Sequence, residues 1–236
     1  MSELRHRVFA FADIEGSSRL STPDKEQAQQ DLASMLEAAC SLAGVESREL
    51  EDRGDGYLLV SLTDVPVRDV IESFASSVDG ALSRRPVGMT RLRVRLTVHQ
   101  GDVLLGARGW RGPQLDRAAR MVDAVEVKAA LKAAQDGRMA LIVAPELYHS
   151  VIRGYQVPDP MAFRLRRLDT KEGPLEAWLT ITGASEQPGR DADEVTMSKP
   201  GQSGQTINQV GTANSSPFGN TVRGGINYGT DQAGNR

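Results

Sequence analysis

Two aspartates, each placed where a strand-like run gives way to a turn, constrain this fold more than any other feature of the sequence. Asp13 lies near the end of an apolar segment that reads as a buried strand. Asp55 lies in the segment Arg53-Gly-Asp-Gly-Tyr57, and Asp-Gly between two strand-like runs predicts a hairpin. If the two strands are neighbours, both carboxylates converge on one point and offer oxygen ligands to a hard divalent cation.

Each aspartate also has a simpler explanation. An aspartate in a hairpin turn commonly serves only to form that turn. Asp13 could instead cap the following helix, whose start we place near Pro23 or slightly earlier. The metal interpretation therefore depends on what else the chain contains.

The composition excludes several classes of function. The chain has 236 residues and a net charge of −3, enough for one domain with a substantial core plus an appendage. Its basic residues are scattered, so no nucleic-acid partner is expected. The amino terminus lacks the apolar core of a signal peptide, and no later run has the length of a membrane span. We therefore expect a cytoplasmic protein without a membrane partner.

The single cysteine is expected to be structural. Cys40 lies in a helical pattern of apolar residues, which predicts a small side chain in the core. It cannot form an internal disulfide, and no histidine lies nearby in sequence to activate a catalytic thiol.

The periodicity of apolar residues predicts an α+β fold. Strands are expected at 5–14, 47–53, 57–62, 91–100 and 102–106, and helices at 24–43 and 66–83. This order, βαββαβ and one more strand, is that of a ferredoxin-like core. After a loop rich in Gly, Arg and Trp, the pattern predicts a helix at 114–134, a strand at 139–143, a helix at 145–152 and a closing hairpin of 163–168 with 176–181.

The composition changes abruptly after about Gly183. Residues 1–182 form the predicted domain, whereas residues 183–236 are rich in Gly, Asn, Gln, Ser, Thr and Asp and predict a disordered polar tail. Within the tail, residues 206–211 and 220–228 alternate polar with apolar side chains. These two segments could add a strand to a partner or assemble with copies of themselves.

Two later segments, taken together with the two aspartates, match the motifs of a known family. Residues 93–106 include Val-His-Gln-Gly-Asp-Val, and residues 112–122 include Asp-Arg-Ala-Ala-Arg. With the two aspartates, this resembles the class III nucleotidyl cyclases. In that family a Phe-x-Asp-Ile-x-Gly strand and a Gly-Asp turn carry the metals, a strand of the type Ile-His-x-Gly-x-Val follows, and a helix opens with Asn-x-Ala-x-Arg. The match runs from about residue 5 to 125, in the same order and at similar spacing.

The resemblance implies a role for each matching residue. Asp13 and Asp55, with the backbone carbonyl of Ile14, would bind two divalent cations, Mn²⁺ or Mg²⁺, that hold a nucleoside triphosphate. Arg120 matches the family's transition-state arginine, whose planar fork suits phosphoryl oxygens; otherwise it is an exposed helix residue in a salt bridge. The resemblance also implies further substrate-binding residues. In the turn after Ile14, the backbone amides of Glu15, Gly16, Ser17 and Ser18 would face phosphate oxygens. In the strand before it, Phe11 would also contact the substrate.

Three positions depart from the family pattern. Asp116 stands where the family has asparagine, and an acidic group there repels phosphates and cannot donate an amide hydrogen bond. Glu51 and Gly109 occupy the base-reading positions, where adenylate cyclases carry Lys and typically Asp or Thr. A carboxylate at Glu51 only accepts hydrogen bonds, so it should prefer a base that offers N–H groups and disfavour adenine. Guanylate cyclases also have Glu at the first position, but Cys at the second.

Trp110, next to Gly109, has two interpretations. Its indole could fill the space that a purine needs and leave room for a pyrimidine, or it could pack the loop against the core. With the base-reading pair, the first interpretation resembles the pyrimidine cyclases of bacterial anti-phage (Pycsar) defence. Those enzymes make cyclic UMP or cyclic CMP for a separate effector protein. Because uracil offers N3–H to Glu51, uridylate is the favoured product, with cytidylate still open.

The resemblance also implies assembly. Class III catalysis occurs at a two-fold interface, with metal aspartates from one subunit and the arginine helix from the other, so a homodimer is expected. His99 is expected to be a structural histidine on a sheet face rather than a general base. Two alternatives stay open: a catalytically silent module that binds nucleotide or a partner, and a guanylate or adenylate cyclase in other signalling.

Overall fold

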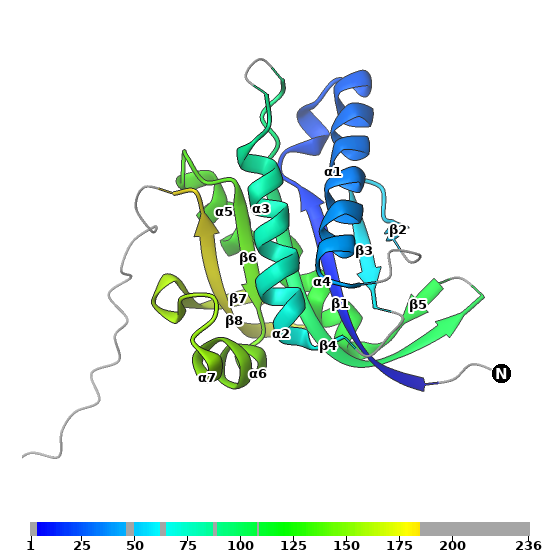
Figure 1. Cartoon of the computed structure of the whole chain (residues 1–236), viewed down its shortest axis with the longest axis vertical. Helices are drawn as coiled ribbons and strands as arrows, with labels where there is room; N and C mark the ends of the chain where they lie inside the picture. The colour runs from blue at the N-terminus through cyan, green and yellow to red at the C-terminus, as the bar shows by residue number, and fades with distance from the viewer. Residues whose placement is uncertain (1–3, 46–49, 62–64, 87–88, 108, 185–236) are drawn as a thin grey trace, which may run out of the picture. The chain divides into compact units, whose positions relative to one another are not determined.

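The computed structural model describes residues 4–45, 50–61, 65–86, 89–107 and 109–184. The predicted tail therefore lies outside the described residues, apart from its first two positions. In the described part, one sheet has the strand order β2-β3-β1-β4-β6-β8-β7, with β5 paired to β4 (Figure 1). The strands are β1 (Leu4–Ile14), β2 (Leu50–Asp52), β3 (Gly56–Val60), β4 (Val94–Gly106), β5 (Gly109–Arg111), β6 (Met139–Val143), β7 (Arg164–Thr170) and β8 (Gly173–Thr182).

Helices cover both faces of this sheet (Figure 1). On one face lie α1 (Thr22–Leu42) and the continuous helix formed by α2 (Val67–Asp69), the π-helical η2 (Val70–Phe74) and α3 (Ala75–Ser83). On the other face lie α4 (Pro113–Asp123) and α5 (Val125–Ala133). A further helix, formed by α6 (Pro145–Leu147), η3 (Tyr148–Ile152) and α7 (Arg153–Tyr155), follows β6, and two short 3-10 segments, η1 (Ser17–Arg19) and η4 (Pro160–Ala162), complete the described elements.

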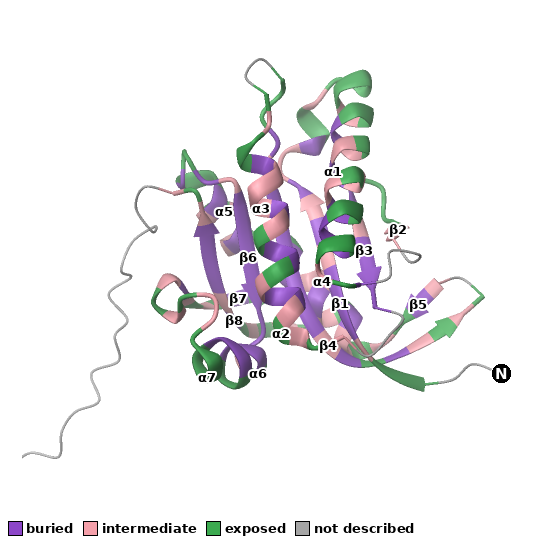
Figure 2. Ribbon diagram, viewed as in Figure 1, coloured by how far each residue is buried: buried purple, intermediate pink, exposed green. Residues whose placement is uncertain are grey.

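The first four strands lie in the order β4-β1-β3-β2, which confirms the predicted ferredoxin-like α+β core. β1 lies at its centre, paired antiparallel to β3 on one side and to β4 on the other. Side chains of β1 alternate between the two layers. Val8, Ala10, Ala12 and Ile14 pack in the core beneath α1 and α3, whereas Phe9 packs with residues of α4. Figure 2 shows most of the neighbouring strands β3 and β6 as buried. By this alternation Asp13 belongs to the α4 and α5 face.

Two sequence predictions about the region after residue 90 need correction. The predicted strands 91–100 and 102–106 form one continuous strand, because β1 pairs with β4 over its whole length, from Leu4 opposite Leu104 to Ile14 opposite Val94. Gly101 stays in this ladder instead of breaking it. The Gly-, Arg- and Trp-rich loop contains β5, which folds back onto the end of β4 and places Trp110 opposite Leu105.

The predicted helix 114–134 is two helices. Ala124 has extended backbone angles (φ −59°, ψ 140°) and separates α4 from α5. The reason lies in what each helix covers, since Leu115 and Ala118 of α4 pack over β1 and β3, whereas Val127 and Leu131 of α5 pack over β6 and β8. One straight helix cannot lie along both parts of a twisted sheet.

The other predicted elements are found close to their expected bounds. α1 begins at Thr22 with Ser21 as its N-cap, and the helix that starts at Pro145 runs on to Tyr155. The predicted segments 47–49 and 62 lie outside the described residues. No helix in the described ranges is long and apolar enough to cross a membrane.

We expect Cys40 to react slowly with alkylating agents in the folded protein. Burial, with the charge of Glu37, raises the pKa of this thiol from 9.0 to about 11. Because the thiolate is the reactive species, labelling by iodoacetamide at pH 8 should be about a hundredfold slower than for a free thiol and should rise with pH up to about pH 11. Mass spectrometry measures the rate at this single cysteine. Equal rates at pH 8 in native buffer and in denaturing urea would contradict the buried position.

Candidate active site

Among the described residues, the largely buried carboxylate of Asp13 has a hydrogen-bond partner for only one of its two oxygens. Its side chain is 16% exposed, and Oδ2 accepts a hydrogen bond from Nη2 of Arg95, the residue directly opposite on β4. The other oxygen, Oδ1, is buried and has no hydrogen-bond partner in the described structure. Burial raises the pKa of Asp13, although the guanidinium group of Arg95 acts in the opposite direction. The free oxygen is thus a buried acceptor that a cation would satisfy.

The hairpin between β2 and β3 brings Asp55 to the same place. The amide of Ile14 donates to the carbonyl of Asp55 (3.2 Å), and Ser17 Oγ donates to Asp55 Oδ2 (2.8 Å). Gly56 lies opposite Asp13, and a Cβ atom on Gly56 would collide with the carbonyl oxygen of Ala12. Only glycine permits this close approach, so the Asp-Gly turn fixes Asp55 beside Asp13. The negative charge of Asp55 also contributes to the raised pKa of Asp13.

The helix-cap explanation of Asp13 is wrong, since the side chain of Ser21 accepts the N-capping hydrogen bond of α1 from the amide of Asp24. Instead, the groups around Asp13 fit a magnesium or manganese site. Two carboxylates and the carbonyl of Ile14 offer oxygen ligands only. No group of three or more His, Cys, Asp or Glu side chains in the described ranges could hold a metal ion. A cation would therefore complete its shell with water and substrate oxygens, which is how magnesium is commonly bound in phosphoryl-transfer sites.

The turn after β1 agrees in part with the expected phosphate site. Gly16 adopts the left-handed conformation (φ 69°), which starts η1 and leaves the amides of Gly16, Ser17 and Ser18 without an acceptor in the described backbone. The prediction that the amide of Glu15 faces a phosphate is wrong, because this amide donates to the carbonyl of Arg93 (2.8 Å). The carboxylate of Glu15 also pairs with Arg93 Nη1 (3.2 Å). Glu15 therefore anchors the turn to β4 and has no amide to offer a phosphate.

Phe11 and Trp110 are core residues of the α4 layer. Phe11 is partly buried against the same apolar cluster as Phe9, two residues from Asp13 on the same side of β1. Trp110 is 7% exposed and packs in that cluster with residues of β3 and α4. Of its two interpretations, the packing one is correct, and the indole is not an arm that projects into a base pocket.

The structure brings the two expected base-reading positions together. The carboxylate of Glu51 lies directly against Gly109, where a Cβ atom would collide with Oε1. Gly109 also has a positive φ of 89°. Arg53 Nη2 holds the same carboxylate at 3.0 Å. The carboxylate of Glu51 therefore occupies the space that a side chain at position 109 would need.

Asp116 and Arg120 lie four residues apart on α4, on one side of that helix. Asp116 is exposed. Arg120 Nη1 pairs with Glu172 Oε2 (2.7 Å) in the turn between β7 and β8. Within the described residues of one chain, the partner of Arg120 is therefore Glu172, whereas that of Asp13 is Arg95.

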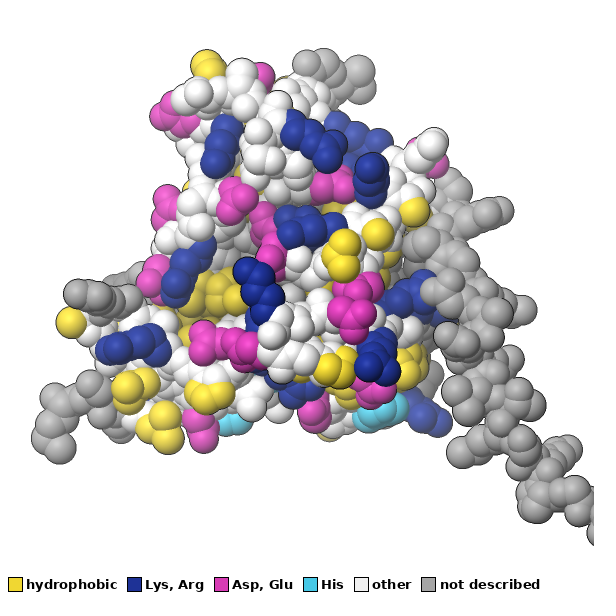
Figure 3. All heavy atoms as spheres, turned by 180° about the vertical axis from the view of Figure 1, so that it is seen from behind, with side chains coloured by type: hydrophobic (Ala, Val, Ile, Leu, Met, Phe, Trp, Pro, Cys, Tyr) yellow, Lys and Arg dark blue, Asp and Glu magenta, His cyan; other side chains and the backbone are white. Residues whose placement is uncertain are grey.

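Charges on the face that carries α4 and α5 are mixed. Figure 3 shows Lys and Arg side chains interspersed with Asp and Glu, and on this view neither sign forms a continuous patch. Among the described side chains, this face therefore lacks the extended basic surface that a nucleic acid would need.

Comparison with known proteins bears on the fold. No protein-family model and no curated protein matches the chain. Among solved structures, it is similar to the catalytic core of a rhodopsin-guanylyl cyclase with converted specificity in complex with ATPαS (TM-score 0.55, 19% identity, 78% of this chain and 99% of that one). It is also similar to an adenylate/guanylate cyclase/hydrolase from Silicibacter pomeroyi (0.55, 20%, 77% and 99%). A third match is the adenylyl cyclase CyaB from P. aeruginosa (0.53, 13%, 80% and 100%).

The chain has the fold of a class III cyclase catalytic domain. At these identities the likeness shows the fold, and the chemistry has to be argued from the residues.

Sequence reasoning missed the partners of the candidate residues. Arg93 and Arg95 are two apart at the start of a strand-like segment, and this spacing indicates that both face one side of the sheet. Arg95 is buried and Arg93 is partly buried, and such arginines need acidic partners, which are Asp13 and Glu15. Glu172, the partner of Arg120, gives no signal in the sequence, because the hairpin that carries it is distant along the chain.

We expect Arg95→Met to destabilise the protein by about 3–5 kcal/mol, because it leaves the carboxylate of Asp13 buried without its partner. The matched control is Arg68→Met, which removes an exposed pair with Glu72 (3.3 Å) and should cost under about 1 kcal/mol. Urea denaturation measures both. The double variant Arg95→Met with Asp13→Leu should recover most of the loss. Equal effects of the two single variants would contradict the buried ion pair.

Proposed function

We propose that this chain is a nucleotidyl cyclase, which converts a nucleoside triphosphate to a 3′,5′-cyclic nucleoside monophosphate and diphosphate, with UTP as the preferred substrate. One observation carries the proposal. Asp13 and Asp55 converge at the end of β1, beside a turn with free amides, in a chain that has the cyclase fold.

These residues suit phosphoryl transfer because that reaction needs positioning and charge neutralisation more than covalent help from the protein. Bound Mg²⁺ or Mn²⁺ would neutralise the triphosphate and activate the ribose 3′-hydroxyl. Asp13 and Asp55 would hold the cations, and Ser17 orients Asp55 by its hydrogen bond (2.8 Å). The amides of Gly16 to Ser18 are placed to donate to phosphate oxygens.

The arginine of this site comes from a second copy of the chain. Arg120 is held by Glu172 in its own chain, and its Nε is buried without a partner. In a two-fold dimer, Arg120 of one subunit would face the triphosphate held by Asp13 and Asp55 of the other. Two equivalent sites follow from such symmetry. The exchange of Glu172 for a phosphoryl group is favourable because a guanidinium fork binds phosphoryl oxygens bidentately.

The preference for UTP rests on Glu51. Its carboxylate accepts hydrogen bonds and donates none, so it pairs with uracil N3–H and leaves adenine N1 unsatisfied. Because Glu51 itself fills the space beside Gly109, one side chain reads the base where the family commonly uses two. A small base with one ring N–H suits that arrangement. CTP remains the second candidate, through the amino group of cytosine.

The cyclic nucleotide would act as a second messenger. By resemblance to the pyrimidine cyclases of anti-phage defence, we propose that it activates a separate effector protein in an infected cell. The exposed carboxylate of Asp116, where the family has asparagine, favours one alternative, a silent nucleotide-binding module. A guanylate cyclase is the other, since guanine also offers a ring N–H to Glu51.

The test is substrate profiling. The purified chain is incubated with ATP, GTP, CTP and UTP, singly and mixed, with Mn²⁺ or Mg²⁺, and products are identified by chromatography and mass spectrometry. We expect cyclic UMP in excess over cyclic CMP, and no product from Asp55→Ala. Cyclic GMP or cyclic AMP as the main product would overturn the pyrimidine assignment, and no product under any condition would overturn the enzymatic proposal.

The same assay tests base reading. Glu51→Gln offers both a donor and an acceptor, so it should lower the UTP to CTP ratio of kcat/KM by about tenfold, the worth of one hydrogen bond to a charged group. Asp52→Asn, the adjacent exposed carboxylate on β2, is the matched control and should leave the ratio unchanged. An unchanged ratio in Glu51→Gln would remove Glu51 from the base site.

A further inference from the structure

A cleft beside the amino end of α4 lies apart from the residues proposed for cyclisation. It has a volume of about 490 Å³ and is lined by side chains of β1, β4, α4 and α6. Asp13, Asp55 and Arg120 do not line it. The polar residues that line it are His6, His99, Gln100, Asp102, Gln114, Arg117 and Glu146.

Three of these side chains carry a buried atom that has no partner in the described structure: His99 Nε2, Gln114 Oε1 and Arg117 Nε. Of the three residues only His99 is itself buried, at 5% exposed. Buried polar atoms are nearly always hydrogen-bonded, so the unpaired Nε2 of this buried histidine indicates a missing partner in the cleft.

His99 presents a hydrogen-bond donor to the cleft. Gln100 lies beyond the part of β4 that pairs with β6, and its amide donates to His99 Nδ1 (2.8 Å). An unpaired buried N–H is rarer than an unpaired carbonyl, so we assign this contact to the amide of Gln100 rather than to its carbonyl oxygen at the same distance. Burial lowers the pKa of His99, against a smaller opposing effect of its hydrogen bond with the backbone of Gln100, and so favours the neutral ring. The one ring hydrogen is then on Nε2.

Arg117 and α4 supply more donors. Arg117 uses Nη1 for Glu146 (3.3 Å) and keeps Nε free. Gln114 packs across Gly101, where a Cβ atom would collide with its side chain, and its amide can turn either end into the cleft. The first two residues of this eleven-residue helix, Pro113 and Gln114, line the cleft, so the positive end of the helix dipole lies beside it.

The acidic residues of the cleft lie at its exposed rim. Asp102 is held by His6 (3.1 Å) and its side chain is 61% exposed. Glu146, the partner of Arg117, is 66% exposed. Both carboxylates can therefore remain in water, whereas His99 and Arg117 of the same cleft each have a buried ring or guanidinium nitrogen without a partner in the described structure.

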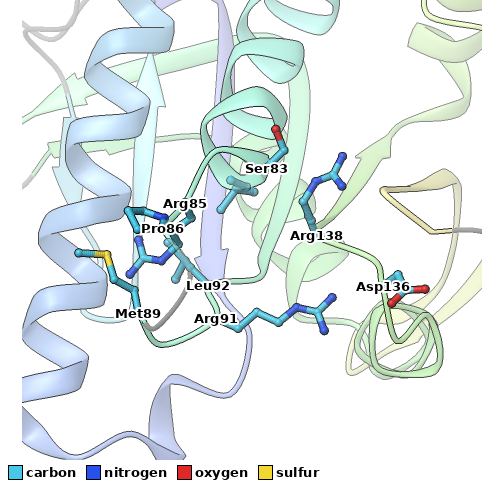
Figure 4. A pocket seen from close by; sticks show the side chains of 9 residues that line it. Ser83, Arg85, Pro86, Met89, Arg91, Leu92, Asp136 and Arg138 are labelled. Carbon is cyan, nitrogen blue, oxygen red and sulfur yellow. The ribbon is translucent and has the colours of Figure 1, made fainter.

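The arginines of a second cavity differ from Arg117 in their partners. It has a volume of about 280 Å³ and contains three arginines that come from the segment after α3 and the segments before β4 and β6 (Figure 4). There, Arg85 pairs with Asp31 (2.6 Å), Arg138 with Asp79 (3.1 Å), and Arg91 donates to the carbonyl of Gly137 (3.1 Å). Unlike Arg117, none of these three arginines has a buried nitrogen without a partner in the described structure.

We propose that the cleft formed by His99, Gln114 and Arg117 binds the phosphate group of a small phosphorylated molecule. Donors that converge from a ring, a guanidinium group and a helix end suit a tetrahedral oxyanion better than a planar carboxylate, which has only two oxygens to share among them. The volume exceeds that of a phosphate ion and leaves room for the rest of the ligand.

Histidine NMR tests this directly. The chain has three histidines, so labelling of the full chain with ¹⁵N-histidine gives three ring signals. At constant pH and ionic strength, inorganic phosphate and ribose 5-phosphate should shift the His99 Nε2 signal saturably. His149, which packs on Tyr148 and Trp178, should not move. Acetate tests the carboxylate alternative and should produce no saturable shift.

Variants assign the binding to this cleft. Arg117→Gln should weaken phosphate binding at least about tenfold, the loss of a charge-assisted hydrogen bond. Arg68→Gln removes an exposed arginine paired with a glutamate elsewhere and should leave the binding unchanged. An unchanged His149 signal shows that a variant is folded, and Gln114→Leu carries the same expectation where Arg117→Gln does not fold. Absence of a saturable shift, an equal response to acetate, or unchanged binding in both cleft variants would overturn the proposal.

Discussion

The rest of the structure depends on the position of β1 between two antiparallel neighbours. This position places Asp13 between Gly56 on β3 and Arg95 on β4. A carboxylate in such a place must be paired, because an isolated buried charge is costly. Arg95 pairs with one oxygen and leaves the other, Oδ1, for a ligand. The same ladder that builds the core thereby creates an acceptor with one missing partner, and the Asp-Gly turn adds a second carboxylate beside it.

The two faces of the sheet differ in what they carry. The face beneath α1 and α3 is apolar core, whereas the face beneath α4 and α5 has both apolar core and the candidate site residues. Glu51 and Gly109 meet at one edge of the sheet, and Arg120 lies on α4 against the β7–β8 turn. Under the proposed function, a two-fold dimer would bring Arg120 of one copy to the aspartate pair of the other.

Local signals in the sequence were sufficient for the core, the aspartate pair and most element bounds. The Asp-Gly turn and the alternation along β1 are short-range patterns, and both predict correctly. The break at Ala124 was missed because it depends on what α4 and α5 cover, and no Gly or Pro marks it. The role of Glu15 was misjudged and that of Trp110 was left between two interpretations for a similar reason, since pairing with Arg93 and packing in one apolar cluster are tertiary contacts. Motif spacing locates a candidate residue, but its partners come from the fold.

The central claim is that the aspartates and the arginine of one site come from two copies of the chain. The most direct measurement mixes two inactive variants, Asp55→Asn and Arg120→Ala, after denaturation and joint refolding. If half of the dimers are mixed and each has one intact site, the mixture should recover about a quarter of the wild-type rate of cyclic nucleotide formation. Each variant refolded alone should stay inactive. No recovery in the mixture, with both variants folded and dimeric, would contradict the shared site and place the whole reaction within one chain.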